Sequence, residues 1–322
     1  MRAVFAESIN PDDPLAGLVV GERPEPDVPD GWTRVAVRAA SLNHHDLWTL
    51  RGVGISAERL PMILGCDAAG IDESTGAEVV VHAVINAPGW SGDDTLDPKR
   101  SLLSERYQGS LAQYVAVPKQ NVITKPADLS FAEAACLSTA WLTAYRMLFV
   151  NSGLRPGQSV LVQGASGGVA TACISMARAA GMRVFATART EEKQQSARDL
   201  GAHEAFASGA RLPEKVDAVM ETVGEATWAH SIRSLRPGGR IVISGATSGP
   251  NPPADLTRIF FLQLQVVGST MGTKAELADL IAFLHATGLR PRIDRTIPLE
   301  SAAEGLAAMA AGDLVGKIVL EV

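Results

Sequence analysis

The chain has 322 residues, of which 46% are hydrophobic and 20% are charged, and its formal net charge is −6. This length suits two domains, and the composition is that of a globular protein able to bury sizeable cores. The acidic balance gives no electrostatic reason to expect nucleic acid or an anionic membrane surface as a partner. Neither a basic-plus-apolar leader nor a run of about 18 apolar residues is found, so we expect a cytoplasmic protein. The three cysteines are widely spaced and predict no disulfide framework.

The first 124 residues indicate an irregular, mostly β domain. Short apolar runs separated by Pro, Gly and Asp predict strands. These runs are 19–26, 33–42, 63–71, 77–85 and 112–118. Residues 86–109 are polar and rich in turn formers, so we expect a surface loop over a cleft.

From residue 126 onward the pattern changes to helices alternating with strands. A helix is predicted over 129–149, with Ser130 and Glu133 as a capping box. Apolar runs at 159–163, 182–188, 204–206, 216–222, 238–245 and 264–269 then alternate with helical stretches, including 191–200 and 225–235. Strands that alternate with helices predict a parallel sheet covered on both faces.

A glycine-rich turn joins the first of these strands to its helix. Small residues there let the backbone approach a pyrophosphate, whose charge favours the helix N-terminus. The predicted pyrophosphate turn consists of Ala165, Ser166, Gly167, Gly168 and Val169.

The residues after the second strand indicate which dinucleotide is bound. An acid that would bind a free ribose 2′-hydroxyl is expected roughly 20 residues past the turn. Ala188 and Arg189 stand there instead, followed by Thr190 and Lys193. This substitution leaves room and positive charge for a 2′-phosphate, so we predict NADPH as the cofactor.

The chain closes with two predicted helices, over 274–288 and within 297–312, and a strand over 317–322. The whole order, with the LTAYRML helix, the GASGGVA turn and the terminal GKIVL, resembles the medium-chain dehydrogenase/reductase superfamily, in particular its zinc-free quinone oxidoreductase and enoyl reductase branch. The resemblance implies an α/β fold in which a Rossmann doubly wound parallel sheet is inserted in a GroES-like, mostly β catalytic domain. The expected limits are 1–124 and 272–322 for the catalytic domain and 125–271 for the cofactor domain, with the active site at their junction.

The resemblance also bears on metal binding. Zinc-dependent members place a Cys where this chain has Asn43, a His-Glu pair at Cys66-Asp67, and a Cys or an acid near Thr139. Asn is a poor zinc ligand, and Thr139 does not complete three protein ligands. We therefore expect no metal, although a nonstandard site made of His44, His45, Cys66 and Asp67 stays open.

Asn43-His44-His45-Asp46 is the densest polar cluster of its segment. By resemblance Asn43 presents an amide to the substrate, His44 faces the cofactor pyrophosphate, and Asp46 orients its neighbours. His45 matches the hydroxyl that handles the substrate proton in alcohol dehydrogenases, and imidazole suits proton donation near neutral pH. The plainer alternative is a surface turn with solvated histidines. Trp48 departs from the Tyr that is common in quinone reductases.

The remaining candidate residues belong to the cofactor. By resemblance Thr143 packs on the nicotinamide, although a helix threonine bonding back to a carbonyl is the alternative. Gly245, Ala246 and Thr247 follow a strand at the end where ligands of such sheets bind. Gly268 and Ser269 resemble the segment that contacts the carboxamide. Lys317 is either structural or close to a phosphate.

We therefore expect an NADPH-dependent enzyme that transfers hydride to a quinone or an α,β-unsaturated carbonyl without zinc. An enoyl-thioester reductase is the first alternative, because Lys99, Arg100 and Arg106 are available for a carrier phosphate. A zinc-free alcohol or aldehyde oxidoreductase and a non-catalytic NADPH-binding sensor or scaffold remain further alternatives. The apolar run 260–269 is the last strand candidate of the sheet, and an exposed edge there predicts a homodimer.

Overall fold

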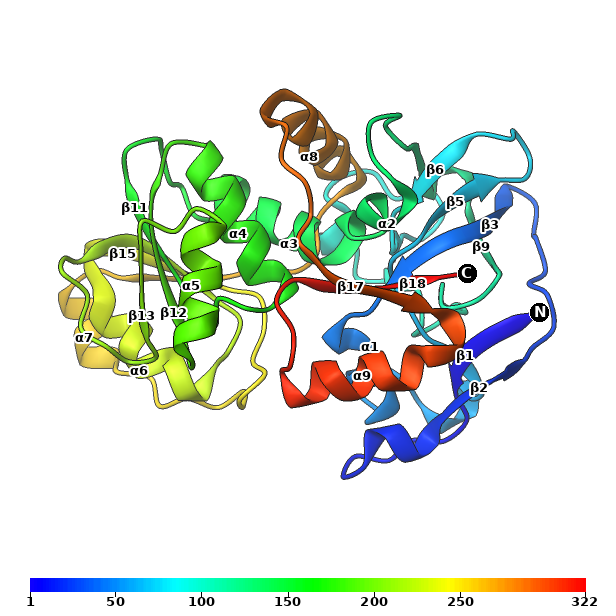
Figure 1. Ribbon diagram of the computed structural model, residues 1–322, viewed down its shortest axis with the longest axis horizontal. Helices are drawn as coiled ribbons and strands as arrows, with labels where there is room; N and C mark the ends of the chain where they lie inside the picture. Colours follow the sequence, from blue (N-terminus) through cyan, green and yellow to red (C-terminus); the bar gives the residue numbers. More distant parts are fainter. The chain divides into compact units, whose positions relative to one another are not determined.

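The computed structural model describes all residues, 1–322, and divides into two compact units. The first unit comprises Met1–Ala140, Met271–Ala282 and Ile293–Val322, and the second comprises Trp141–Thr270 and Phe283–Arg292. Both ends of the chain therefore belong to the first unit, where Figure 1 shows them. The domain limits 124/125 and 271/272 remain a prediction. No helix combines the length and apolar character needed to cross a membrane.

The first unit is mostly β. Its strands are β1 (Arg2–Ala6), β2 (Leu18–Glu22), β3 (Trp32–Ser41), β4 (Met62–Ile63), β5 (Ala69–Asp72), β6 (Glu78–Val81), β7 (Val84–Ile85), β8 (Ser101–Leu102), β9 (Tyr114–Pro118), β10 (Val122–Thr124), β17 (Ile293–Pro298) and β18 (Lys317–Glu321). The main sheet has the order β10-β6-β5-β3-β18-β17, and β9 also pairs with β3. A three-stranded sheet β2-β1-β4 and the pair β7-β8 complete the unit.

Strand β3 organises this unit. Val35, Val37 and Ala39 are buried, while Ala36 and Arg38 between them are more exposed, which is the period-two pattern of a strand with one face on the core. One end of β3 pairs with β9 and the other with β18, so the C-terminal strand lies beside residues 39–41. The helix α1 (His44–Leu50) begins immediately after this end of β3.

The short helical segments of the first unit join these strands. They are η1 (Pro14–Gly17), η2 (Ala57–Arg59), η3 (Asp94–Leu96), η4 (Lys119–Asn121), α2 (Phe131–Ala134), η7 (Leu299–Ser301) and α9 (Ala302–Ala311). The expected surface loop 86–109 is only partly at the surface, because Asp97, Leu103 and Ser104 are buried. Asp97 accepts hydrogen bonds from the backbone N–H groups of Ala87 and Lys99, which draws the loop inward.

The second unit contains a six-stranded parallel sheet of order β13-β12-β11-β14-β15-β16. Its strands are β11 (Ser159–Val162), β12 (Arg183–Ala188), β13 (Glu204–Ala207), β14 (Val216–Glu221), β15 (Leu235–Ile243) and β16 (Gln265–Gly268). Its main helices are α4 (Gly168–Ala179), α5 (Glu191–Asp199), α6 (Glu225–Ser234) and α7 (Leu256–Phe261). Figure 1 shows α4 and α5 on one side of the strands and α6 and α7 on the other. The parallel sheet and the predicted α/β fold class are confirmed.

Two predicted elements need correction. The helix expected over 129–149 is a helical run in which α2 and α3 (Leu142–Tyr145) are separated and followed by wider, π-type turns over Leu137–Trp141 and Arg146–Asn151. The capping box of Ser130 and Glu133 at its start is confirmed. The strand candidate 260–269 is shorter than expected. Residues 260–261 form the end of α7, and the strand β16 begins at Gln265. The helix α8 (Lys274–Thr287) contributes residues to both units.

Candidate functional site

The turn from β3 into α1 is held by the buried carboxylate of Asp46. Its Oδ2 accepts a hydrogen bond of 2.8 Å from the backbone N–H of Asn43, and its Oδ1 accepts one of 3.0 Å from Gly65. The first bond caps α1, and the second ties the helix to the segment that carries Cys66 and Asp67. Burial raises the pKa of Asp46 to about 6. These two hydrogen bonds fit the predicted role of Asp46 in orienting its neighbours, which stays a prediction.

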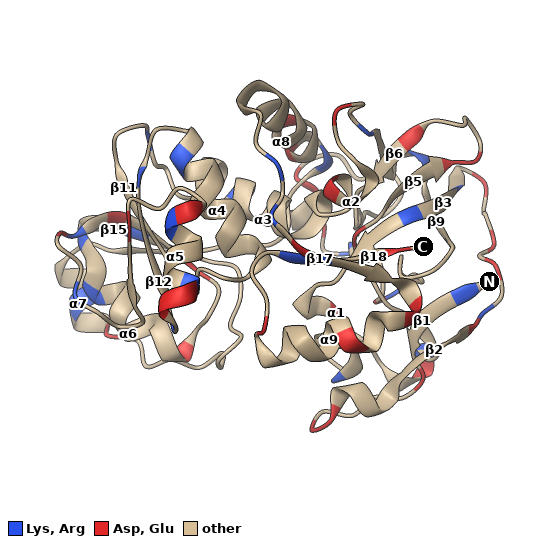
Figure 2. Cartoon of the chain, in the orientation of Figure 1, with Lys and Arg blue, Asp and Glu red and all other residues tan.

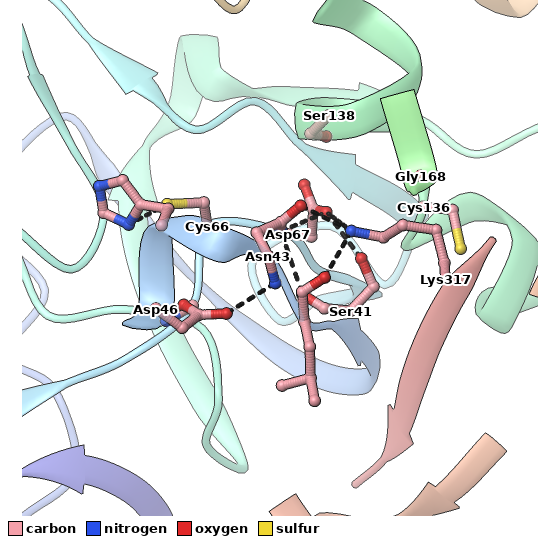
Figure 3. A network of polar contacts seen from close by, with 12 residues as sticks. Ser41, Asn43, Asp46, Cys66, Asp67, Cys136, Ser138, Gly168 and Lys317 are labelled. Carbon is pink, nitrogen blue, oxygen red and sulfur yellow. Dashed lines mark hydrogen bonds and ion pairs between the residues drawn. The ribbon is translucent and has the colours of Figure 1, made fainter. Parts of the chain in front are cut away.

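Behind this turn a buried network joins β3, β18 and the segment after β4 (Figure 3). Asp67 Oδ2 accepts hydrogen bonds from Ser41 Oγ at 2.7 Å and from Asn43 Nδ2 at 2.9 Å. The ammonium of Lys317 donates to the backbone oxygen of Leu42 and to Asn43 Oδ1, both at 2.6 Å, and lies 3.5 Å from Asp67 Oδ2. Asp67 is 0% and Lys317 3% exposed. The ammonium thus meets three protein oxygens, which favours the structural alternative for Lys317.

The amide of Asn43 is fully engaged in this network. Besides its bonds to Asp67 and Lys317, its Nδ2 donates to the backbone oxygen of Ser41 at 3.2 Å. The prediction that Asn43 presents its amide to a substrate therefore requires one of these bonds to open. Two buried side-chain atoms at the positions compared with zinc ligands, Asp67 Oδ1 and Thr139 Oγ1, have no hydrogen-bond partner.

His44 and His45 lie in different surroundings. His44 is exposed, as expected of a solvated turn. The side chain of His45 is only 14% exposed, and its Nε2 lies 3.2 Å from Glu105 Oε1. Its Nδ1 lies 3.2 Å from Ser104 Oγ and 3.4 Å from Cys66 Sγ. The solvated-turn alternative is therefore wrong for His45.

These contacts set the protonation of His45. Burial by itself lowers the pKa of His45, but the contacts with Cys66, Glu105 and Asp46 outweigh burial and hold that pKa well above its ordinary value. Burial by itself raises the pKa of Glu105, yet the hydrogen bond and charge of His45 lower it overall. Burial raises the pKa of the Cys66 thiol overall, although the charge and hydrogen bond of His45 act to lower it. These contacts favour the imidazolium form of His45 beside the Glu105 carboxylate.

The donor atoms around Cys66 do not fit a zinc ion. Its Sγ donates to the backbone oxygen of Leu103 at 3.2 Å, and the neighbouring carboxylate of Asp67 already faces the Lys317 ammonium. A zinc site needs three or four converging ligands, and a buried cation beside it opposes a second cation. The chain brings together no group of three or more His, Cys, Asp and Glu side chains that could hold a metal ion. The nonstandard site of His44, His45, Cys66 and Asp67 is therefore not assembled.

In the second unit the predicted pyrophosphate turn leads from β11 into α4. Gly164 has a φ of +65°, in the left-handed region that favours glycine. A side chain at Gly167 would meet no atom within 4 Å, so the space over this turn is open. The first N–H groups of α4 have no partner within the helix. These features fit a bound pyrophosphate, which such N–H groups and the helix dipole stabilise.

The other predicted cofactor residues follow the carboxyl ends of neighbouring parallel strands. Arg189 comes directly after β12, is exposed and forms no ion pair, whereas the Thr190 hydroxyl accepts a hydrogen bond from the backbone N–H of Lys193 and caps α5. Figure 2 shows both signs of charge on α5. The segments 245–247 and 268–269 follow β15 and β16 at the same edge of the sheet, and Thr143 is buried in α3. The structure thus brings the turn, Arg189 and both segments to one edge, and their contact with a cofactor stays a prediction.

Sequence reasoning missed the residues that support the candidates. Ser41 and Glu105 were not singled out, although they contact Asp67 and His45. Glu221, at the end of β14, is fully buried and accepts hydrogen bonds from Thr227, Ser231 and the backbone N–H of Val223. An acid at the end of an apolar strand was the only signal for Glu221, whereas nothing local pointed to Glu105.

The chain matches two family descriptions and is similar to many known proteins. Residues 29–127 match the family described as alcohol dehydrogenase GroES-like domain, and residues 168–286 match the family described as zinc-binding dehydrogenase. The quinone oxidoreductase of Lama guanicoe is 30% identical over 306 residues, which cover 89% of this chain and 87% of that protein. The chain belongs to the medium-chain dehydrogenase/reductase superfamily. It is therefore an oxidoreductase.

Two further similar proteins are named for other substrates. The crotonyl-CoA carboxylase/reductase of Cereibacter sphaeroides is 30% identical over 317 residues, covering 82% of this chain and 74% of that protein. A crystal structure of an NAD-dependent alcohol dehydrogenase is 34% identical, covers 100% of both chains and has a TM-score of 0.93. The relatives thus include proteins named for quinones, enoyl thioesters and alcohols.

Proposed function

We propose that this chain is an NADPH-dependent reductase that transfers hydride to a quinone or an α,β-unsaturated carbonyl without zinc. The observation that carries the proposal is the exposed, unpaired Arg189 at the carboxyl end of β12, combined with the open glycine turn before α4. When bound, NADPH supplies the hydride, so the protein has to bind, orient and protonate.

Cofactor choice depends on the end of β12. A cation in place of the ribose-binding acid favours a 2′-phosphate, to which an Arg makes charge-assisted hydrogen bonds. One similar structure is named as an NAD-dependent alcohol dehydrogenase. The preference for NADPH over NADH is therefore the first part of the proposal to measure. In the proposal the second unit holds the cofactor, with Thr143, the turn 165–169, the segment 245–247 and residues 268–269 as its contacts.

The first unit supplies the polar groups for the acceptor. Because the donor set around Cys66 does not suit zinc, the growing negative charge on the acceptor oxygen has to be met by protein donors or water. His45 is the donor we propose, since its contacts, among them the one with Glu105, raise its pKa and favour the protonated form. Asp46 positions it through the cap of α1, and the Asn43 amide, which bonds to Lys317 and Asp67, would have to open one of these bonds to meet the acceptor.

The test is a panel of quinones, enones, enoyl thioesters, alcohols and aldehydes assayed with NADPH and with NADH, on protein whose zinc content has been measured. We expect NADPH consumption with quinones or enones, substoichiometric zinc, and activity that survives chelators. Activity only with alcohols or aldehydes would assign the oxidoreductase alternative. A full equivalent of zinc lost together with activity would overturn the metal-free mechanism. Stoichiometric NADPH binding without turnover of any acceptor would indicate a sensor.

An enoyl-thioester reductase remains the second candidate. One relative is named as a crotonyl-CoA carboxylase/reductase. In addition, the three cations predicted for a carrier phosphate, Lys99, Arg100 and Arg106, line one pocket.

A further inference from the structure

A pocket of about 210 Å³ lies in the first unit, between the segment after α1 and the segment around β8. Four cationic side chains and one carboxylate surround it. The lining residues are Gly54, Arg59, Lys99, Arg100, Ser101, Glu105 and Arg106. Arg59 lies about 40 positions before the other cations in the chain, yet all of them line the same pocket. Arg59 thus adds a fourth cation to Lys99, Arg100 and Arg106, which the sequence had indicated.

None of the four cations forms an ion pair. Arg100 Nη1 donates only to the backbone oxygen of Asp97 at 3.3 Å, and the guanidinium of Arg106 lies 5.7 Å from the centre of the Tyr107 ring. Some arginines elsewhere are paired: Arg34 contacts Glu25 and Glu73, and Arg183 contacts Glu204 and Glu214. The difference is notable because the chain has more acids than bases, 35 to 29.

The one carboxylate of the pocket does not neutralise these cations. Glu105 Oε1 faces His45 Nε2, and its Oε2 accepts a hydrogen bond from the backbone N–H of Leu102 at 3.4 Å. The charge of Glu105 is therefore balanced mainly by His45, with a smaller contribution from Arg100, and the pocket keeps a net positive charge. Gly54, with a φ of +81°, lies against Glu105, because a Cβ there would come within 3.0 Å of Oε1.

Four like charges around one small pocket repel one another, and a bound anion of more than one charge relieves that repulsion. Arginine matches phosphate oxygens in pairs, and lysine adds a point charge. We infer that this pocket is a phosphate-binding subsite for the acceptor, which is then an enoyl thioester of a phosphate-bearing carrier. The inference rests on the proposed function for the enone, whereas the phosphate site rests on the pocket alone. Glu105 joins the subsite to His45.

The experiment compares two acceptors that carry the same enone. Crotonyl-CoA has phosphates, and the crotonyl thioester of N-acetylcysteamine has none. With wild-type protein and NADPH we expect kcat/KM to be at least tenfold higher for crotonyl-CoA, roughly the value of one charge-assisted contact. The quadruple variant Arg59→Gln/Lys99→Gln/Arg100→Gln/Arg106→Gln removes most of that preference. The matched control Arg38→Gln/Lys119→Gln removes two exposed cations outside the pocket and should retain the preference for crotonyl-CoA.

A binding measurement separates this inference from the proposed function. Free CoA and inorganic phosphate are titrated calorimetrically into the wild-type protein and both variants, after circular dichroism has shown that each is folded. CoA that binds the wild type and is weakened at least tenfold by the quadruple variant supports the subsite, even if no acceptor is reduced and the proposed function fails. Equal kcat/KM for the two thioesters, together with no CoA binding, overturns the subsite and leaves enone reduction intact. Binding of phosphate but not CoA assigns the pocket to a free anion and overturns the carrier thioester.

Discussion

The ammonium of Lys317 on β18 lies 3.5 Å from the carboxylate of Asp67, which is 250 residues earlier in the chain. The two side chains are buried together, and Ser41 and Asn43 supply further hydrogen bonds to the same carboxylate oxygen. Because β18 pairs with the end of β3, the C-terminal strand carries its cation to the segment where zinc-dependent relatives hold a metal. The positive charge beside Asp67 is thus supplied by the chain itself.

Replacing one partner of this pair is expected to destabilise the fold. Lys317→Met leaves the Asp67 carboxylate buried without a counter-charge, which typically costs about 3–5 kcal/mol in the free energy of unfolding. The double variant Lys317→Met/Asp67→Asn removes both charges and should recover most of that loss. Urea unfolding of the wild type, both single variants and the double variant measures the coupling. Additive losses would mean that the two charges do not interact.

Arg189 is expected to decide the cofactor. A charge-assisted hydrogen bond is worth roughly 1.5–3 kcal/mol, so NADPH should bind at least about tenfold more tightly than NADH. Arg189→Ala should weaken NADPH selectively and leave NADH nearly unchanged. Arg198→Ala is the control, because Arg198 on α5 pairs with Glu191 and has no predicted cofactor role. Fluorescence titration of both nucleotides provides the measurement, and equal affinities in the wild type would end the claim.

The sequence predicted the features that depend on residues close together in the chain. The parallel strands, the glycine turn and the capping box of Ser130 follow from hydrophobic period, backbone freedom and helix-end hydrogen bonding, and each is present. Two partners of His45, Ser104 and Glu105, lie about 60 residues away in the chain, on a segment that had been expected at the surface. Its inward course depends on a few contacts such as those of Asp97, which no periodicity reports. Likewise the pairing of β18 with β3, and hence the burial of Lys317, is a property of the tertiary fold.

The edge of the second sheet is expected to form a dimer. Strand β16 pairs on one side only, and Val266 on it is 46% exposed, while Phe261 just before it is 77% exposed. An unpaired apolar edge favours pairing with a twofold-related copy, so light scattering at micromolar concentration should give about twice the 33.8 kDa of the chain. Val266→Lys should shift the mass to that of one chain. A wild-type protein that is already monomeric would contradict the prediction.

The ion pair of His45 and Glu105 predicts a pH-dependent stability. The raised pKa of His45 stabilises the fold fully below its ordinary value of 6.5 and loses this effect as pH rises through the raised pKa. The lowered pKa of Glu105 stabilises the fold fully above its ordinary value of 4.5 and loses this effect as pH falls through the lowered pKa. The pair therefore contributes most between these two values. Glu105→Gln should lower stability most in that window, as measured by urea unfolding across pH.

The contact between His45 and Glu105 also predicts that His45 donates the proton to the reduced acceptor. General acid catalysis typically contributes about 10²–10⁴-fold, so His45→Ala should lower kcat by that order for an enone while leaving NADPH affinity largely intact. The loss should be smaller for a quinone, whose reduced oxygen is acidic enough to take its proton from water. Glu105→Gln retains the imidazole but lowers its pKa, so the fall in kcat at high pH should begin at a lower pH than in the wild type. His44→Ala is the comparison, because exposed His44 is predicted to contact the cofactor, and its loss should weaken NADPH binding instead. If His45→Ala keeps full kcat with every acceptor, water is the donor and the imidazolium serves only to hold Glu105.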